Sequence, residues 1–220
     1  MDSVAILLIE SIYQVDYYWG GSMKKLLSFV AAMLLSAVMA LPAFAADFSA
    51  AQMKKMSTFL SNFTEVRMMD FSAKEVLESS NPYEMIHFGI RHNYVNNYNR
   101  SIKRCNCPYG ELSMDGSWVR NTLKKYFDYD LKGLPTVKTP EVYFSDGVRY
   151  HFRGADGEAT YYARVTNAER LANGHVQMTG TIYNAEEPSD ILGTFRAIAK
   201  PHTWKGQPTW AIISLRARYR

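Results

Sequence analysis

The sequence has few of the features from which an activity is usually inferred. Two cysteines in 220 residues exclude a small protein built on a disulfide framework. There is no G-x-S-x-G or H-E-x-x-H motif, and no phosphate loop or dinucleotide fingerprint. The net charge is only +4, without a dense basic cluster, which argues against a nucleic-acid partner. The sequence therefore predicts no catalytic residue and no cofactor.

One long apolar run, Leu26–Leu41, lies near the N-terminus. Two lysines precede it, and a Pro-Ala-Phe-Ala segment ending at Ala45 places small residues at the positions that signal peptidase reads. A membrane-spanning helix needs about 20 apolar residues, more than this run supplies. We interpret residues 23–45 as a signal peptide and expect an exported protein, periplasmic or secreted, without a stable membrane anchor after cleavage.

Residues 1–22 precede this signal, although a signal peptide normally begins at the initiator methionine. Met23 is followed by two lysines, and the codons of Gly20 and Gly21 resemble a ribosome-binding site. We interpret residues 1–22 as a misannotated upstream leader, with a genuine extended leader as the alternative. The mature protein is then residues 46–220, a single domain.

Two periodicities divide the mature chain. Up to about Leu131 apolar residues recur at three and four positions, which predicts helices, and after Thr139 they alternate between Asp-Gly and Asn-Gly turns, which predicts hairpins. The predicted helix caps are Ser49, Ser72, Asn81 and Ser113. The predicted strands are 141–144, 148–153, 159–166, 175–184, 191–200 and 209–219. The pattern predicts an α+β fold with N-terminal helices packed on one face of a curved C-terminal antiparallel β-meander.

Four segments, in order, are similar to a group of uncharacterised exported bacterial proteins that have helices before a small sheet. They are FLSNF with Glu65, HFGIRHNYVNNYNR, KKYFDYDL and VYFSDGVRYHF. The resemblance covers about the whole mature chain and implies no activity or catalytic residue. This chain lacks the lipobox cysteine of the lipid-anchored members. The expected arrangement also resembles NTF2-like and cystatin-like folds, which often have a cavity between helices and sheet; this is an analogy of fold only.

Cys105 and Cys107 form a C-x-C pair before a proline. Because thiols oxidise readily outside the cytoplasm, we favour a local disulfide, which a turn would allow and an extended segment would strain. Free or intermolecular thiols and a redox function are the alternatives. His87 and His92 are also zinc-ligand types, but they lie about 140° apart around a helix, so no metal site is predicted.

Five further residues are candidate ligand-binding residues. His87, Arg91 and Tyr94 lie at helical steps of three and four. Tyr98 ends an aromatic-aliphatic stripe with Ile86, Ile90 and Tyr94, and Trp204 lies in a predicted loop. Ordinary pairing on a helix flank, and the preference of strands for aromatic residues, would explain the same pattern without a ligand.

The leading hypothesis is a non-enzymatic module that binds an unknown ligand or protein of the bacterial cell envelope. Two alternatives stay open. The first is an enzyme on an NTF2-like cone in which His87 or His92 is a general base beside a carboxylate. The second is a thiol-redox accessory protein that uses Cys105 and Cys107.

Overall fold

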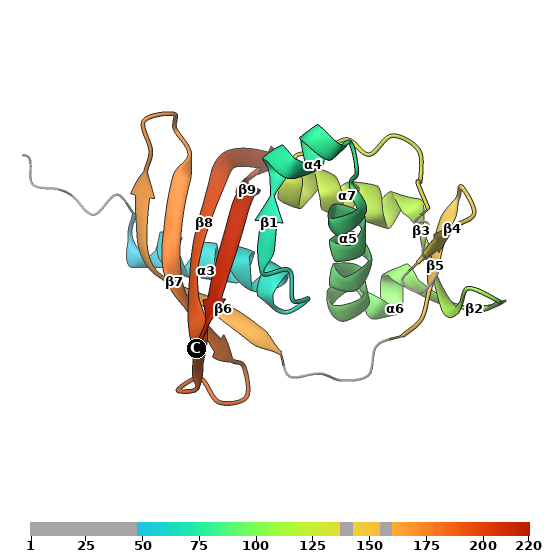
Figure 1. Ribbon diagram of the computed structural model, residues 1–220, viewed down its shortest axis with the longest axis horizontal. Coiled ribbons are helices and arrows are strands. Elements are labelled where there is room, and N and C mark those ends of the chain that lie inside the picture. Colours follow the sequence, from blue (N-terminus) through green and yellow to red (C-terminus); the bar gives the residue numbers. More distant parts are fainter. Residues whose placement is uncertain (1–47, 137–142, 155–159) are drawn as a thin grey trace, which may run out of the picture. The chain divides into compact units, whose positions relative to one another are not determined.

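A computed structural model describes residues 48–136, 143–154 and 160–220 (Figure 1). The predicted leader and signal peptide lie outside these residues, as do parts of the strands predicted at 141–144 and 159–166. Ala46–Arg220 forms one compact unit. Its architecture is α+β with the helices mostly N-terminal, as predicted. The strands, however, form two antiparallel sheets, where the sequence predicts a single meander.

The larger sheet has five strands in the order β1-β9-β8-β7-β6, and every neighbouring pair is antiparallel. The strands are β1 (Asp70–Ser72), β6 (Tyr161–Arg170), β7 (Val176–Asn184), β8 (Ile191–Trp204) and β9 (Gln207–Tyr219). Four of them occupy the predicted C-terminal positions. Along β7 and β8, Met178, Ile182 and Phe195 are buried while Thr194 and Arg196 are exposed, so one face belongs to the core.

The smaller sheet has four strands in the order β2-β3-β5-β4. They are β2 (Ile102–Cys107), β3 (Gly110–Asp115), β4 (Phe144–Ser145) and β5 (Arg149–Phe152). The first two replace part of the predicted helical region. Leu112 and Met114 alternate in β3 and pair with Phe152 and Tyr150 of β5, which buries all four side chains. The apolar spacing of this short segment fits a helix or a strand. Pairing with a segment 35 or more residues away makes it a strand.

The helices are α3 (Ala50–Thr64), α4 (Ala73–Ser79), α5 (Tyr83–Asn96), α6 (Tyr98–Ser101) and α7 (Gly116–Phe127). The predicted caps at Ser49 and Ser72 are confirmed, the first as a complete capping box. Asn81 accepts a hydrogen bond from the Tyr83 amide (3.1 Å), and α5 begins one residue later than predicted. The fourth prediction is wrong: Ser113 lies inside β3, and Asp115 caps α7 by accepting from the Ser117 amide.

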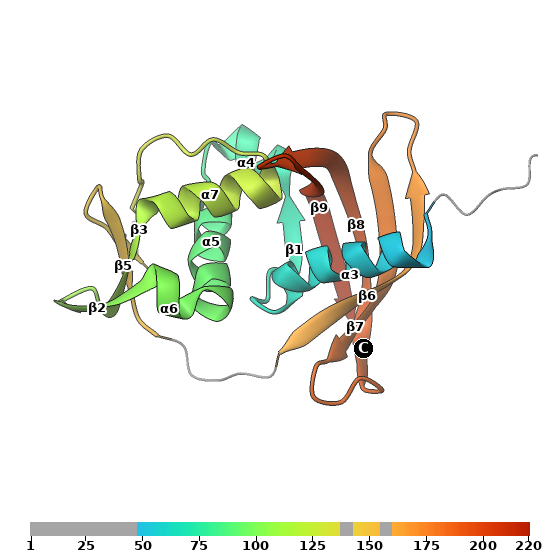
Figure 2. The ribbon, with the colours of Figure 1, turned by 180° about the vertical axis from the view of Figure 1, so that it is seen from behind.

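Helix α3 runs across the larger sheet and along its edge strand β6 (Figure 2). The Ser57 hydroxyl accepts a hydrogen bond from the Val165 amide (2.9 Å). One turn further on, the Ser61 hydroxyl accepts from the Ala163 amide (3.1 Å). The Thr64 hydroxyl donates to the Tyr161 carbonyl (2.7 Å). Helix side chains thereby satisfy backbone groups that an edge strand otherwise leaves open to another chain.

An aromatic core joins α3, α5 and α7. The ring of Phe63 stacks on that of Phe88 (4.7 Å between centroids) and meets Tyr126 and Phe127 edge-on. At Gly89 a Cβ atom would lie 3.0 Å from side-chain atoms of α7, so the absence of a side chain lets the two helices approach. Within the described residues, no helix has the length and apolar character needed to cross a membrane.

Candidate functional site

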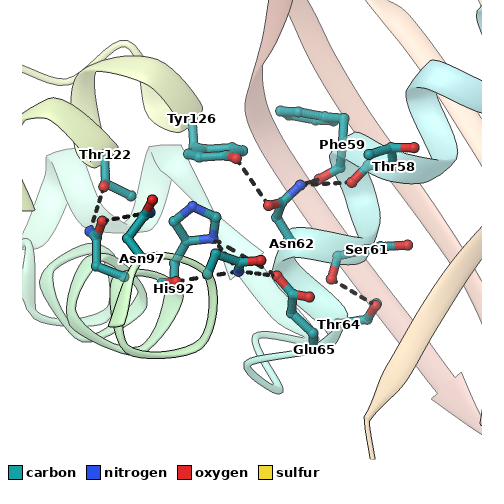
Figure 3. Close-up of polar contacts among 12 residues, drawn as sticks. Thr58, Phe59, Ser61, Asn62, Thr64, Glu65, His92, Asn97, Thr122 and Tyr126 are labelled. Atoms are coloured by element: carbon teal, nitrogen blue, oxygen red, sulfur yellow. Dashed lines mark hydrogen bonds and ion pairs between the residues drawn. The ribbon is translucent and has the colours of Figure 1, made fainter. Parts of the chain in front are cut away.

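A chain of polar side chains joins α3 to α7 (Figure 3). The Tyr126 hydroxyl donates to Asn62 Oδ1 (3.0 Å) and accepts from Lys125 Nζ (3.0 Å). Asn62 Nδ2 in turn donates to the Thr58 carbonyl (2.7 Å). Burial raises the pKa of Tyr126, with a further contribution from the nearby Glu65, so its hydroxyl keeps its proton and acts as a donor.

A second group joins α3 to α5. Asn96 Nδ2 donates to Glu65 Oε1 (2.6 Å) and lies 3.3 Å from His92 Nδ1, which is itself 3.9 Å from Glu65 Oε1. Burial, followed by the charge of Lys125, lowers the pKa of His92 to about 4, and burial raises the pKa of Glu65 despite the Asn96 hydrogen bond. The imidazole is therefore neutral at pH 7, and its contact with Glu65 is not an ion pair.

Glu65 and Asn96 also line a groove of about 340 Å³ between α3 and β6. Its other lining residues are Lys54, Ser57, Thr58, Ser61, Asn62, Tyr162, Ala163 and Tyr183. The Tyr162 and Tyr183 rings meet edge-on (6.2 Å), and the Arg164 guanidinium lies 4.6 Å from the centre of the Tyr183 ring. The groove thus combines a carboxyl, amides and a lysine with two aromatic rings.

His87 and Arg91, both predicted binding residues, line a different pocket of about 490 Å³. Val66 to Asp70 and residues of the N-terminal half of α5 form its walls. His87 stacks on Tyr83 (6.1 Å), and burial, with Arg91 nearby, lowers the pKa of His87. No carboxylate within ion-pair distance of His87 is found among the described residues.

The other three predicted residues lie elsewhere. Tyr94 and Tyr98 line a pocket of about 420 Å³ together with Arg104, Cys105 and three other residues. Trp204 is the last residue of β8, where the Lys205 ammonium lies 5.4 Å from its ring. The five predicted residues therefore do not line one pocket. Four lie on α5 and α6, whose successive turns face different neighbours, and Trp204 lies at the end of β8.

Cys105 and Cys107 are free thiols in the structure, and the disulfide favoured from the sequence stays a prediction. Both lie in β2, and residues two apart in a strand are about 6.6 Å apart, near the upper limit for a bridge. Each sulfur instead lies close to Nδ1 of His151, at 3.2 and 3.3 Å. A hydrogen bond between the thiols raises the pKa of Cys105 and lowers that of Cys107.

Sequence reasoning missed the residues that the structure brings together. Asn62 and Glu65 stand in the first segment of the family resemblance, yet nothing in their spacing indicates a groove. His151 lies 44 residues beyond Cys107 and reaches it only through the pairing of β2 and β5 with β3. Comparison of the chain with known protein families, with curated proteins and with solved structures gave no match.

The chemistry available in the α3–β6 groove is limited by its single carboxyl group. Glu65 is the one acidic residue among those that line it. Hydrolysis of glycosides ordinarily uses two carboxyl groups on either side of the scissile bond. Glu65 can accept or donate one hydrogen bond to a ligand, and no hydrogen bond from the described residues reaches its second oxygen, Oε2.

Proposed function

We propose that the protein is an exported, non-enzymatic binding module of the bacterial cell envelope that holds a carbohydrate in the α3–β6 groove. The composition of the groove supports this proposal. Tyr162 is 36% exposed and offers a ring face, while Lys54, Glu65 and Asn96 offer charged and amide groups for hydroxyls. Sugars present both an apolar ring face and a rim of hydroxyls, so this combination suits them.

The network behind the groove supports binding because it fixes the polar groups before a ligand arrives. Asn62 is held by Tyr126, and Glu65 is held by Asn96. Groups that are already oriented lose little conformational entropy when a ligand binds. The predicted envelope location would supply polysaccharides as ligands.

The test is isothermal titration calorimetry of the mature protein with soluble peptidoglycan glycan strands and with chitotriose. We expect saturable binding that Tyr162→Ala weakens about five-fold, the equivalent of about 1 kcal/mol for one ring contact. Glu65→Gln keeps the shape of the side chain and should weaken binding by loss of a charged acceptor.

Tyr98→Ala is the matched control, because it removes an exposed tyrosine from a different pocket. It should leave the affinity unchanged. Absence of binding to both glycans would refute the carbohydrate proposal, as would binding that depends on Tyr98 and not on Tyr162.

An enzymatic alternative is favoured by one observation, the raised pKa of Glu65, since a carboxyl that holds its proton more tightly suits a general acid. In this version His92, which is only 6% exposed and does not line the groove, would position Glu65 through Asn96. Release of reducing sugar from the same glycan strands, abolished in Glu65→Gln, would establish it over simple binding.

A further inference from the structure

Three soft or borderline metal-ligand atoms meet on the smaller sheet. The two sulfurs of Cys105 and Cys107 come from β2, and Nδ1 of His151 comes from β5. All three atoms lie within 4.8 Å of one another, and each sulfur lies 3.2 or 3.3 Å from the imidazole nitrogen. The three side chains are half-buried, so they remain within reach of solvent.

Asp146 contacts one ring nitrogen of His151, Nε2, and the other ring nitrogen, Nδ1, faces the two sulfurs. Its Oδ2 lies 2.9 Å from His151 Nε2, while its Oδ1 accepts hydrogen bonds from the Val148 and Arg149 amides (2.8 and 2.6 Å). Because an ionised carboxylate only accepts hydrogen bonds, Nε2 carries a proton, and in the neutral imidazole Nδ1 then has the lone pair that a metal ion can bind. A carboxylate behind a ligating histidine is the usual outer shell of a zinc site.

We propose that Cys105, Cys107 and His151 bind one Zn²⁺ ion, with Asp146 positioning the histidine and a fourth coordination position open to water or a small ligand. Tetrahedral zinc with Zn–S near 2.3 Å and Zn–N near 2.0–2.1 Å requires an S···N separation of about 3.5 Å. The observed separations of 3.2 and 3.3 Å need to widen by only a few tenths of an ångström.

The chemical types of the three ligand atoms favour Zn²⁺ over Mg²⁺ and Ca²⁺. Mg²⁺ and Ca²⁺ require oxygen ligands, and the three atoms are two sulfurs and a nitrogen. Two thiolates and an imidazole give Zn²⁺ a neutral complex of the three-ligand type that keeps one position open. The ring of Phe144, stacked on Tyr109 (3.8 Å), lies 6.2 Å from the His151 ring and forms an aromatic neighbour of the cluster.

Binding exchanges protons for the metal. Each S–H bond breaks as an S–Zn bond forms, and the protons pass to solvent, so one zinc ion releases up to two protons from a protein whose thiols are both protonated. No electron is transferred and no oxidant is required, in contrast to the thiol-redox hypothesis. Zinc uptake should consequently weaken as the pH falls.

The experiment uses the mature protein, fully reduced and free of metal, under nitrogen. Titration with Co²⁺ should produce thiolate-to-cobalt charge-transfer absorption that saturates at one ion per chain, and Zn²⁺ should then abolish it stoichiometrically. Zinc should also protect both thiols from alkylation and release protons into a weakly buffered indicator solution. None of these readouts depends on a ligand in the α3–β6 groove.

Substitutions test which residues bind the zinc ion. Cys105→Ser, Cys107→Ser and His151→Gln should each lower zinc affinity at least ten-fold. Asp146→Asn keeps an oxygen for the turn amides and should lower affinity ten- to a hundred-fold, as expected for an outer-shell partner. The matched control, His87→Gln, removes a half-buried histidine from another pocket and should change nothing. Circular dichroism verifies that each variant is folded.

Three results would overturn the proposal. The first is a reduced, folded protein that binds no stoichiometric zinc. The second is zinc binding that survives all three ligand substitutions. The third is binding of copper(I) without binding of zinc, which would assign the cluster to a different metal.

Discussion

Asn93 connects α5 to α7 from within the core. It is 1% exposed, and its Nδ2 donates to the Gly89 carbonyl (2.8 Å) and to the Thr122 hydroxyl (2.7 Å). Its Oδ1 accepts from Asn97 (3.0 Å). Asparagine is a poor helix former because it competes for backbone hydrogen bonds. Here the competing hydrogen bonds join two helices, so these tertiary contacts offset the low helix propensity of asparagine.

Replacing Asn93 with alanine should lower the free energy of unfolding by about 2 kcal/mol, because several buried hydrogen bonds are lost at once. Urea denaturation followed by circular dichroism measures the change. Asn99→Ala, at an exposed position of α6, is the control and should stay within about 0.5 kcal/mol of the natural protein. Equal effects of the two substitutions would contradict the assigned role of Asn93.

His92 should make the stability depend on pH. Its pKa is about 4 in the folded protein, against an ordinary value of 6.5, so the unfolded chain takes up a proton first as the pH falls. The stability that neutral His92 provides is complete above pH 6.5 and is lost progressively toward pH 4. Glu65 acts in the opposite direction, because its raised pKa lets the folded protein bind a proton more readily.

Between pH 7 and pH 5 we expect a net loss of about 1 to 2 kcal/mol in the free energy of unfolding. Urea denaturation at both pH values measures it. His92→Gln should reduce the loss, and His175→Gln, in the turn between β6 and β7, should leave it unchanged. A loss that persists in full in His92→Gln would assign the effect to other groups.

Three hydroxyl side chains of α3 form hydrogen bonds with the backbone of the larger sheet. Ser57, Ser61 and Thr64 lie three or four residues apart, so all three face β6 and bond to its backbone. An isolated helix gains nothing from serine at these positions. These hydroxyls stabilise the protein by covering the edge of the five-stranded sheet.

The double substitution Ser57→Ala and Ser61→Ala should speed hydrogen exchange at the Val165 and Ala163 amides and destabilise the protein by about 1–3 kcal/mol per lost partner. Exchange in β8, at the centre of the sheet, should follow only the global loss of stability. Thr58→Ala is the control, because the Thr58 hydroxyl bonds within α3 to the Lys54 carbonyl. Unchanged exchange at Ala163 and Val165 would refute the edge-covering role.

The described core lies within one compact unit, Ala46–Arg220. Ala46–Arg220 contains a continuous core that runs from Phe48 to Leu215 and includes side chains from both sheets and from all helices but the short α6. A domain whose core lies entirely within one stretch of chain can fold without the residues before it. Removal of residues 1–45 is therefore compatible with the fold.

The signal-peptide interpretation predicts a mature protein that begins at Ala46. Intact-mass spectrometry and N-terminal sequencing of the protein recovered from its natural host measure this directly. We expect the mass of residues 46–220, and replacement of Ala43 and Ala45 by bulky residues should block cleavage. A recovered protein that retains residues 23–45, or any peptide from residues 1–22, would contradict the signal-peptide interpretation.

Local chemistry made much of the secondary structure predictable. The capping box of Ser49 and Gln52 depends on residues three apart, and the Asn173-Gly174 turn joins β6 and β7, which pair directly. The small sheet was not predictable in this way, since β3 becomes a strand by pairing with β5. The predicted binding residues do not share one pocket, because helical spacing places side chains on a face without showing what that face meets.

The amino-acid sequence alone determined most of the helices and the C-terminal strands, because caps, turns and apolar periods act between neighbours in the chain. Only the tertiary structure decided that there are two sheets, that Glu65 and Asn96 border one groove, and that His151 meets Cys105 and Cys107. Each of these depends on contacts between residues about 30 or more apart. Such contacts follow from the packing of whole elements, and no local pattern in the sequence records them.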